Sequence, residues 1–143
     1  MKENRRPIKA RASKWATGIT DALLKRNISP NQISIASVVF ALAGASLLIV
    51  DNGVMGSIAC ALFIQLRLLC NLLDGMVAIE GGKQSSLGSL YNEFPDRVAD
   101  SVLIVGLGSA IGYSDLGWLG ALAAALTAYV RVFGGSIGLT QCF

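Results

Sequence analysis

Long hydrophobic runs separated by short polar segments dominate this chain. Residues 33 to 50 contain no charged side chain, and a second run from about 54 to 79 becomes polar only in its second half. Two further runs cover roughly residues 87 to 113 and 118 to 133. Because about 20 apolar residues in a helix cross a bilayer, this pattern predicts about four transmembrane helices.

The first thirty residues have a different pattern, with eight Lys and Arg residues against only Glu3 and Asp21. The apolar residues of this segment recur at helical spacing opposite the basic ones: Ala12, Trp15, Ile19, Ala22 and Leu23. This is typical of an amphipathic helix on the membrane surface, although a solvated basic tail is an alternative. We therefore predict a single domain, 1–143, in which 1–30 is a juxtamembrane segment and 31–143 forms the transmembrane helices.

Composition supports an all-α integral membrane protein. Hydrophobic residues make up 53% of the chain, charged residues 15%, and the mean hydropathy is +0.59. The chain contains no histidine, which excludes Ser-His-Asp and Cys-His catalysis and the usual zinc ligands. A metal would therefore be bound by oxygen, which favours Mg²⁺ or Mn²⁺. No nucleic-acid partner is expected.

Charge placement predicts the orientation in the membrane. The turns that contain Asp51 and Asp115 have no Lys or Arg, whereas the N-terminal segment, Lys83 and Arg131 fall on the other side. Because positive residues favour the cytoplasmic side, we expect a multi-pass protein of the cytoplasmic (inner) membrane with a cytoplasmic N-terminus.

Polar side chains at helical spacing interrupt the second and third runs. Their positions are Asn71, Asp74 and Ala78 on the second run, and Gly88, Asn92, Asp96 and Asp100 on the third. Each set lies on one helix face, so the two polar stripes can converge. Ionisable groups at membrane depth are costly and commonly functional, although a buried polar network that only fixes helix packing is the alternative. Counting residues from the intervening loop places Arg67 level with Asp100, and we predict that they pair.

The same segment resembles the signature of the CDP-alcohol phosphotransferase family, DxxDGxxAR followed by eight residues and GxxxDxxxD. The matching positions are Asn71, Asp74, Gly75, Ala78, Ile79, Gly88, Asn92 and Asp96. All spacings agree, but Asn71, Asn92 and Ile79 replace two aspartates and an arginine. A second register, which sets Asn92, Asp96 and Asp100 against GxxxDxxxD, lengthens the spacer and loses the glycine.

The resemblance implies roles for these positions. In the family the four acids hold two divalent cations, so Asp74 and Asp96 would be metal ligands, and Asp96 the candidate catalytic base. Asn71 and Asn92 would offer carbonyl oxygens to the metal, with Asp100 or Glu93 as replacement carboxylates. The implied substrate-binding residues are Gly75, Ala78, Gly88 and Arg131. Arg131 would bind an acceptor phosphate or, alternatively, anchor its helix at the interface.

The resemblance also implies an enzyme of phospholipid biosynthesis. It would transfer a phosphatidyl group from CDP-diacylglycerol, or a similar CDP-alcohol held among membrane lipids, to a small alcohol acceptor and release CMP. The alternative is a catalytically weakened relative that acts as a lipid-binding or assembly partner. The family usually has six spans, so a truncated bundle lacking its C-terminal part, or a homodimer that closes the site, is expected.

One further motif is interpreted as structural. Gly106, Gly108 and Gly112 resemble a glycine-rich nucleotide loop, but they lie inside an apolar run with no preceding strand. We predict that these glycines allow close helix packing.

Overall fold

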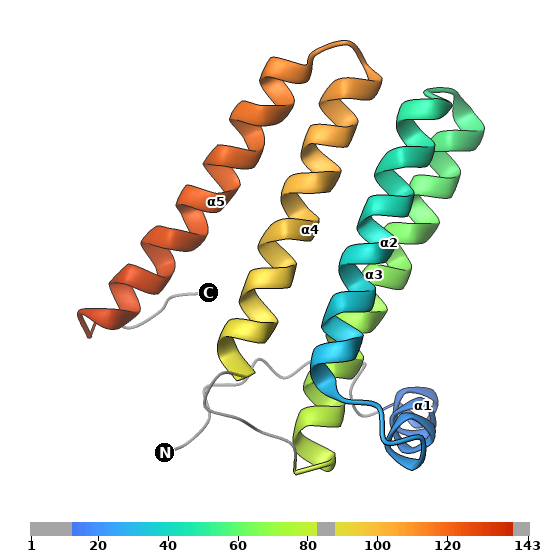
Figure 1. The fold of residues 1–143 in the computed structure, drawn as a ribbon, viewed down its shortest axis with the longest axis vertical. Coiled ribbons are helices and arrows are strands. Elements are labelled where there is room, and N and C mark those ends of the chain that lie inside the picture. The colour runs from blue at the N-terminus through green and yellow to red at the C-terminus, as the bar shows by residue number, and fades with distance from the viewer. Residues whose placement is uncertain (1–12, 83–87, 139–143) are drawn as a thin grey trace.

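The computed structural model describes residues 13–82 and 88–138, and the side chains of 13–82 and 93–138. Every regular element within these residues is a helix: α1 Lys14–Lys25, α2 Pro30–Val50, α3 Val54–Glu80, α4 Gly88–Ala110 and α5 Ser114–Ser136. The four long helices run alongside one another, and α1 lies across the base of the bundle (Figure 1). The predicted all-α architecture with a separate N-terminal helix is confirmed.

Helix α2 is central to the packing. It contacts both α3 and α4, while α5 packs against α4. One core cluster near α1 is built on Ile33, Cys70, Leu73 and Val77, and a second towards the opposite end on Leu48, Cys60 and Ala110. Cys60, Cys70 and Ala110 in these clusters have short side chains, which lets the helices approach closely there.

Three helices, α2, α3 and α5, are long and apolar enough to cross a membrane. Helix α4 is long enough, with 23 residues, but it carries Glu93, Asp96, Arg97 and Asp100 between its first turn and its middle and is not among these three helices. These four charges separate α4 from the other three helices in composition. The polar half of α4 is also the part that faces the charged residues of α3.

The glycine prediction is confirmed at two positions. A Cβ at Gly106 would lie 2.7 Å from the Ala45 Cβ on α2, and one at Gly108 would lie 2.7 Å from the Gly117 Cα on α5. At Gly112 the prediction is wrong, because its φ is +80° and no atom would lie within 4 Å of an added Cβ. Gly112 instead adopts the left-handed conformation that ends α4.

Helix α1 has two distinct faces. Ala16 and Thr20 are fully buried, and the Thr20 hydroxyl lies 3.8 Å from the Met76 sulfur on α3. Trp15 and Ile19, from the predicted apolar stripe, are exposed. The helix thus docks on the bundle through small residues and leaves an apolar face of the kind that enters the headgroup layer.

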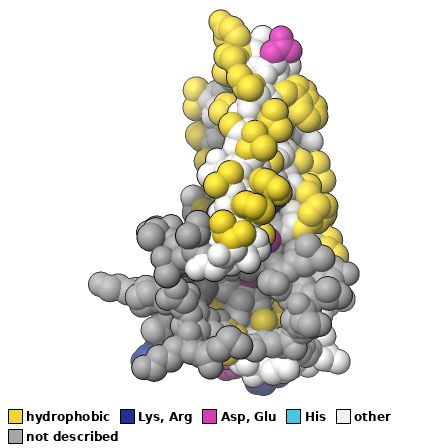
Figure 2. All heavy atoms as spheres, turned by 90° about the vertical axis from the view of Figure 1, so that its left-hand side faces the viewer, with side chains coloured by type: hydrophobic (Ala, Val, Ile, Leu, Met, Phe, Trp, Pro, Cys, Tyr) yellow, Lys and Arg dark blue, Asp and Glu magenta, His cyan; other side chains and the backbone are white. Residues whose placement is uncertain are grey.

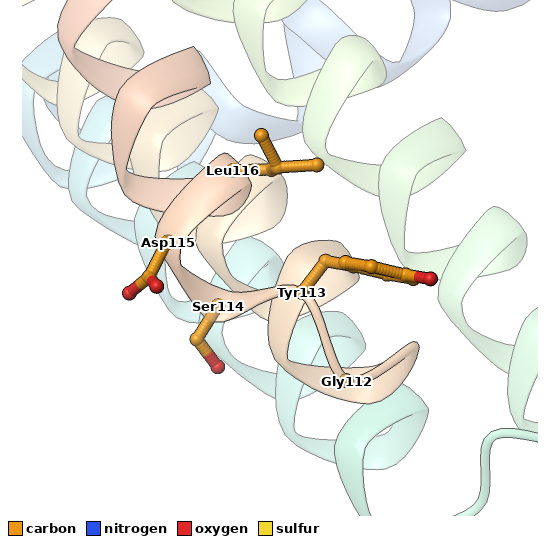
Figure 3. Close-up of a pocket in the computed structure, with 5 residues that line it drawn as sticks. All are labelled: Gly112, Tyr113, Ser114, Asp115 and Leu116. Atoms are coloured by element: carbon orange, nitrogen blue, oxygen red, sulfur yellow. The ribbon is translucent and has the colours of Figure 1, made fainter.

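The two ends of the bundle are distinct. The α2–α3 and α4–α5 turns lie at one end, whereas α1 and the end of α3 lie at the other (Figure 1). A pocket of about 390 Å³ at the α4–α5 turn is lined by Gly112, Tyr113, Ser114, Asp115 and Leu116 (Figure 3). The Asp51 and Asp115 turns lie at the same end of the bundle, as the sequence predicted, while Lys83 lies outside the described residues.

Exposed hydrophobic side chains gather over the upper part of the α5 side of the molecule (Figure 2). They include Trp118, Leu119, Leu122, Leu126, Tyr129 and Val130. A row of large exposed apolar side chains of this kind fits a helix that faces lipid rather than water.

Helix α2 begins with a capping box. The Ser29 hydroxyl accepts from the Gln32 backbone N–H, and the Gln32 side chain accepts from the Ser29 backbone N–H, with Pro30 at the first helical position. We expect Ser29→Ala to lower the free energy of unfolding by about 1 kcal/mol, measured by denaturant titration in detergent micelles. Ser57→Ala, which removes an exposed hydroxyl within α3, should change it by less than about 0.5 kcal/mol. Equal effects of the two variants would contradict the capping role.

Candidate active site

Helix α3 supplies the inner part of the site. Arg67, Asn71 and Asp74 follow one another at successive turns of the helix, so they share one face. Arg67 is 7% exposed and Asp74 is 5% exposed, which is unusual for charged side chains. Both therefore need partners on neighbouring helices.

Helix α4 provides partners for two of these residues. The Asn71 Nδ2 donates to the Asp96 Oδ1 across 2.6 Å, which joins two positions of the predicted motif. The Arg67 Nη2 lies 2.8 Å from the Asp100 Oδ1 and 3.5 Å from the Asp96 Oδ1. The predicted Arg67–Asp100 pair is confirmed, and it joins the same two helices as the motif contact.

Asp74 is engaged on a different helix. Its Oδ2 accepts a hydrogen bond of 2.8 Å from the Ser34 hydroxyl of α2. The sequence analysis placed Asp74 on a stripe that converges with the one containing Asn92, whose side chain lies outside the described residues. Ser34 was missed, although Ser34 and Ser37 stand at i and i+3 as polar positions of an apolar helix.

Further ion pairs connect residues within the same part of α4 and join α4 to α5. The Arg97 Nη1 is 3.1 Å from the Asp100 Oδ2, and the Arg97 Nε is 3.9 Å from the Glu93 Oε2. Glu93 also accepts from the Arg131 Nη2 on α5. Arg131, predicted to bind a phosphate or to anchor its helix, is therefore tied to α4 by a half-exposed ion pair.

The cluster of charged residues is balanced. Arg67, Arg97 and Arg131 alternate with the carboxylates of Glu93, Asp96 and Asp100. Only Arg67 is buried; the other five side chains are partly exposed, so the pairs that involve Arg67 should matter most for stability. Of the other predicted site residues, Gly75 and Ala78 lie half-buried on α3. The surroundings of Gly88 and the side chain of Asn92 are not described.

The fold and this charged layer define a helical membrane protein whose polar residues meet between two long helices. Residues 27–140 match the CDP-alcohol phosphatidyltransferase family, and the chain belongs to that family.

A curated relative extends this picture. The chain is 30% identical over 81 residues to the inner membrane protein YnbA of Escherichia coli (strain K12). That alignment covers 57% of this chain and 40% of YnbA, so the chain spans well under half the length of this relative. No solved structure matches the chain significantly.

Members of the family generally use divalent metal ions, so the side chains can be tested for fit to one. Within the described part of the chain, no three His, Cys, Asp or Glu side chains are grouped so as to hold a metal ion. The motif carboxylates accept instead from protein donors, Asp74 from Ser34 and Asp96 from Asn71. The described residues therefore do not fit a metal centre, and we assign no reaction step to one.

Proposed function

We propose that this protein acts in phospholipid biosynthesis by transferring a substituted phosphate group from a CDP-alcohol such as CDP-diacylglycerol to an acceptor alcohol. The observation that carries the proposal is the Asn71–Asp96 hydrogen bond, which joins the two halves of the family motif between α3 and α4. Membership of the family supports the same reaction class.

The membrane setting suits this substrate. CDP-diacylglycerol keeps its acyl chains in the bilayer, while its pyrophosphate lies at the surface. The motif residues lie in the half of the bundle next to α1, whose exposed Trp15 and Ile19 suit the headgroup layer. We propose that this end is cytoplasmic, in agreement with the basic N-terminal segment.

In the proposed reaction, Asp96 is the general base. The acceptor's hydroxyl oxygen forms a new bond to the phosphorus that carries the diacylglycerol, the pyrophosphate P–O bond breaks, and CMP leaves with its electron pair. The hydroxyl proton passes to the Asp96 carboxylate. The Asn71 amide and the Arg67 guanidinium orient that carboxylate, and Asp74, held by Ser34, fixes α3 against α2.

Two expectations from the sequence are tested alongside this proposal. The oxygen ligands of the motif favoured Mg²⁺ or Mn²⁺, whereas the described residues form no metal centre, so the assay below measures whether CMP release requires a metal. A homodimer that completes the site is a further expectation from the sequence.

We expect the purified chain, in vesicles that contain CDP-diacylglycerol, to release CMP when small alcohols are supplied. Asp96→Asn should reduce the rate by about 10²–10⁴-fold, as expected for loss of a general base. Asp115→Asn is the matched control, because this exposed carboxylate lies at the opposite end of the bundle and should leave the rate unchanged. The assay is run with Mg²⁺, with Mn²⁺ and with EDTA.

The same CMP-release assay separates a transferase from the alternative, a catalytically weakened relative that binds lipid or acts as an assembly partner. Activity that is insensitive to both Asp74→Asn and Asp96→Asn would remove these residues from the reaction. No CMP release with any alcohol, from a correctly folded chain, would favour a lipid-binding or assembly partner. The amides at positions 71 and 92 are the observation that keeps this second candidate open.

A further inference from the structure

Asn71 and Asp96 stand where the family motif has two aspartates. Two carboxylates with oxygens 2.6 Å apart would repel each other unless a cation or a proton lay between them. Here the amide of Asn71 donates directly to the carboxylate of Asp96, so the contact is attractive without any ion. The substitution therefore removes the electrostatic need for a cation at this contact.

A positive charge is nevertheless present beside it. The Arg67 guanidinium lies 3.5 Å from the same Asp96 oxygen and 2.8 Å from Asp100. Its Nη2 also contacts the Asp96 backbone carbonyl at 3.4 Å. One buried arginine thus contacts two carboxylates of α4 at once, as a bound divalent ion would.

The geometry points to Arg67 as a built-in cation that takes the place of a divalent ion between α3 and α4. The acidic residues of α4 are then held against α3 by the protein's own charge, and the helices assemble without metal. This inference rests on the proposed function in one respect: it assumes that the reaction takes place between α3 and α4.

Arg67 also has one hydrogen-bond donor, its Nε–H, that could bind substrate. The buried Arg67 Nε–H has no hydrogen-bond acceptor within the described part of the chain. A phosphate oxygen of the CDP-alcohol could accept from it, because guanidinium groups pair well with phosphate. A metal ion, by contrast, would need additional oxygen ligands here.

Metal binding by the full-length chain in detergent tests this inference without substrate. Free Mn²⁺ is followed by electron paramagnetic resonance, and the unfolding midpoint is measured with Mn²⁺ and with EDTA. The native chain should bind no Mn²⁺ at the site, and its midpoint should be the same in both. Asn71→Asp restores a carboxylate opposite Asp96 and should bind Mn²⁺ at least about tenfold more tightly than the native chain, with a higher midpoint in Mn²⁺.

Two further variants complete the test. Arg67→Met removes the built-in cation while keeping an unbranched side chain, and should gain Mn²⁺ binding and be stabilised by the ion. Arg131→Met removes an arginine that contacts only Glu93 among the described residues, and should behave like the native chain. If Arg67→Met does not fold in either condition, Asn71→Asp alone decides the outcome.

The opposite result is equally clear. Mn²⁺ binding by the native chain as tight as that of Asn71→Asp would overturn the role of Arg67 as a substitute cation. If the Mn²⁺ results hold but no CMP is released under any condition, the proposed function fails while this inference stands. CMP release by the native chain that persists in EDTA would support both the proposed transferase activity and the role of Arg67 as a substitute cation.

Discussion

Replacing Gly108 by alanine should force helices α4 and α5 apart and lower the free energy of unfolding by about 1–3 kcal/mol. The added Cβ would lie 2.7 Å from the Gly117 Cα, 2.8 Å from the Gly117 backbone nitrogen and 2.9 Å from the Tyr113 carbonyl oxygen. All three are backbone atoms, so no side chain can rotate away and the helices themselves must shift. Chemical denaturation of the purified protein in micelles measures the loss.

The matched control is the same substitution at Gly18. This glycine lies inside α1 and has no atom within 4 Å of an added Cβ. Gly18→Ala should therefore stabilise the protein by up to about 1 kcal/mol through helix propensity. A similar loss at both positions would show that close α4–α5 approach is not what Gly108 provides.

Replacing Arg67 by methionine should have the largest effect of any single change, a loss of about 3–5 kcal/mol in metal-free buffer. The buried guanidinium bridges Asp96 and Asp100, and its removal takes away the only positive charge within 4 Å of Asp96 among the described residues, leaving Asp96 with Asn71 and Asp100 with Arg97. The expected loss is measured as the change in unfolding free energy relative to the native chain.

A double-mutant cycle assigns this loss to the ion pair. Adding Asp100→Asn to Arg67→Met removes one of the two carboxylates that lost this arginine, so the double variant should be more stable than the sum of the single losses predicts. Arg131→Met, whose pair with Glu93 is half-exposed, should cost no more than about 1 kcal/mol. Strict additivity of the Arg67 and Asp100 variants would contradict the pairing.

The sequence was sufficient to predict the helices, because apolar runs of membrane length leave few alternatives. It also predicted the Arg67–Asp100 pair, since depth along two antiparallel helices can be counted from the loop between them. Depth, however, does not say towards which neighbour a side chain turns. Asp74 was placed on the stripe that converges with α4, and its hydrogen bond from Ser34 on α2 was not foreseen.

The roles of the motif residues were harder to predict for a related reason. Helical spacing placed Asn71 and Asp96 on converging faces, and their hydrogen bond confirms the convergence. Spacing alone could not show that the Asn71 amide donates to the Asp96 carboxylate, because it does not give the orientation of the side chain. Glu93 illustrates the same limit: it was considered as a replacement carboxylate, and it contacts Arg97 and Arg131.

The unequal packing of α5 has a mechanical consequence. Helix α2 is held on two sides, by α3 and α4, whereas α5 packs chiefly on α4 and is otherwise covered with exposed apolar side chains. Under a force applied at its far end, α5 should peel away from α4 in a separate early step, while α2, α3 and α4 yield together later. The unfolding trace of this chain would then contain two rupture events rather than one.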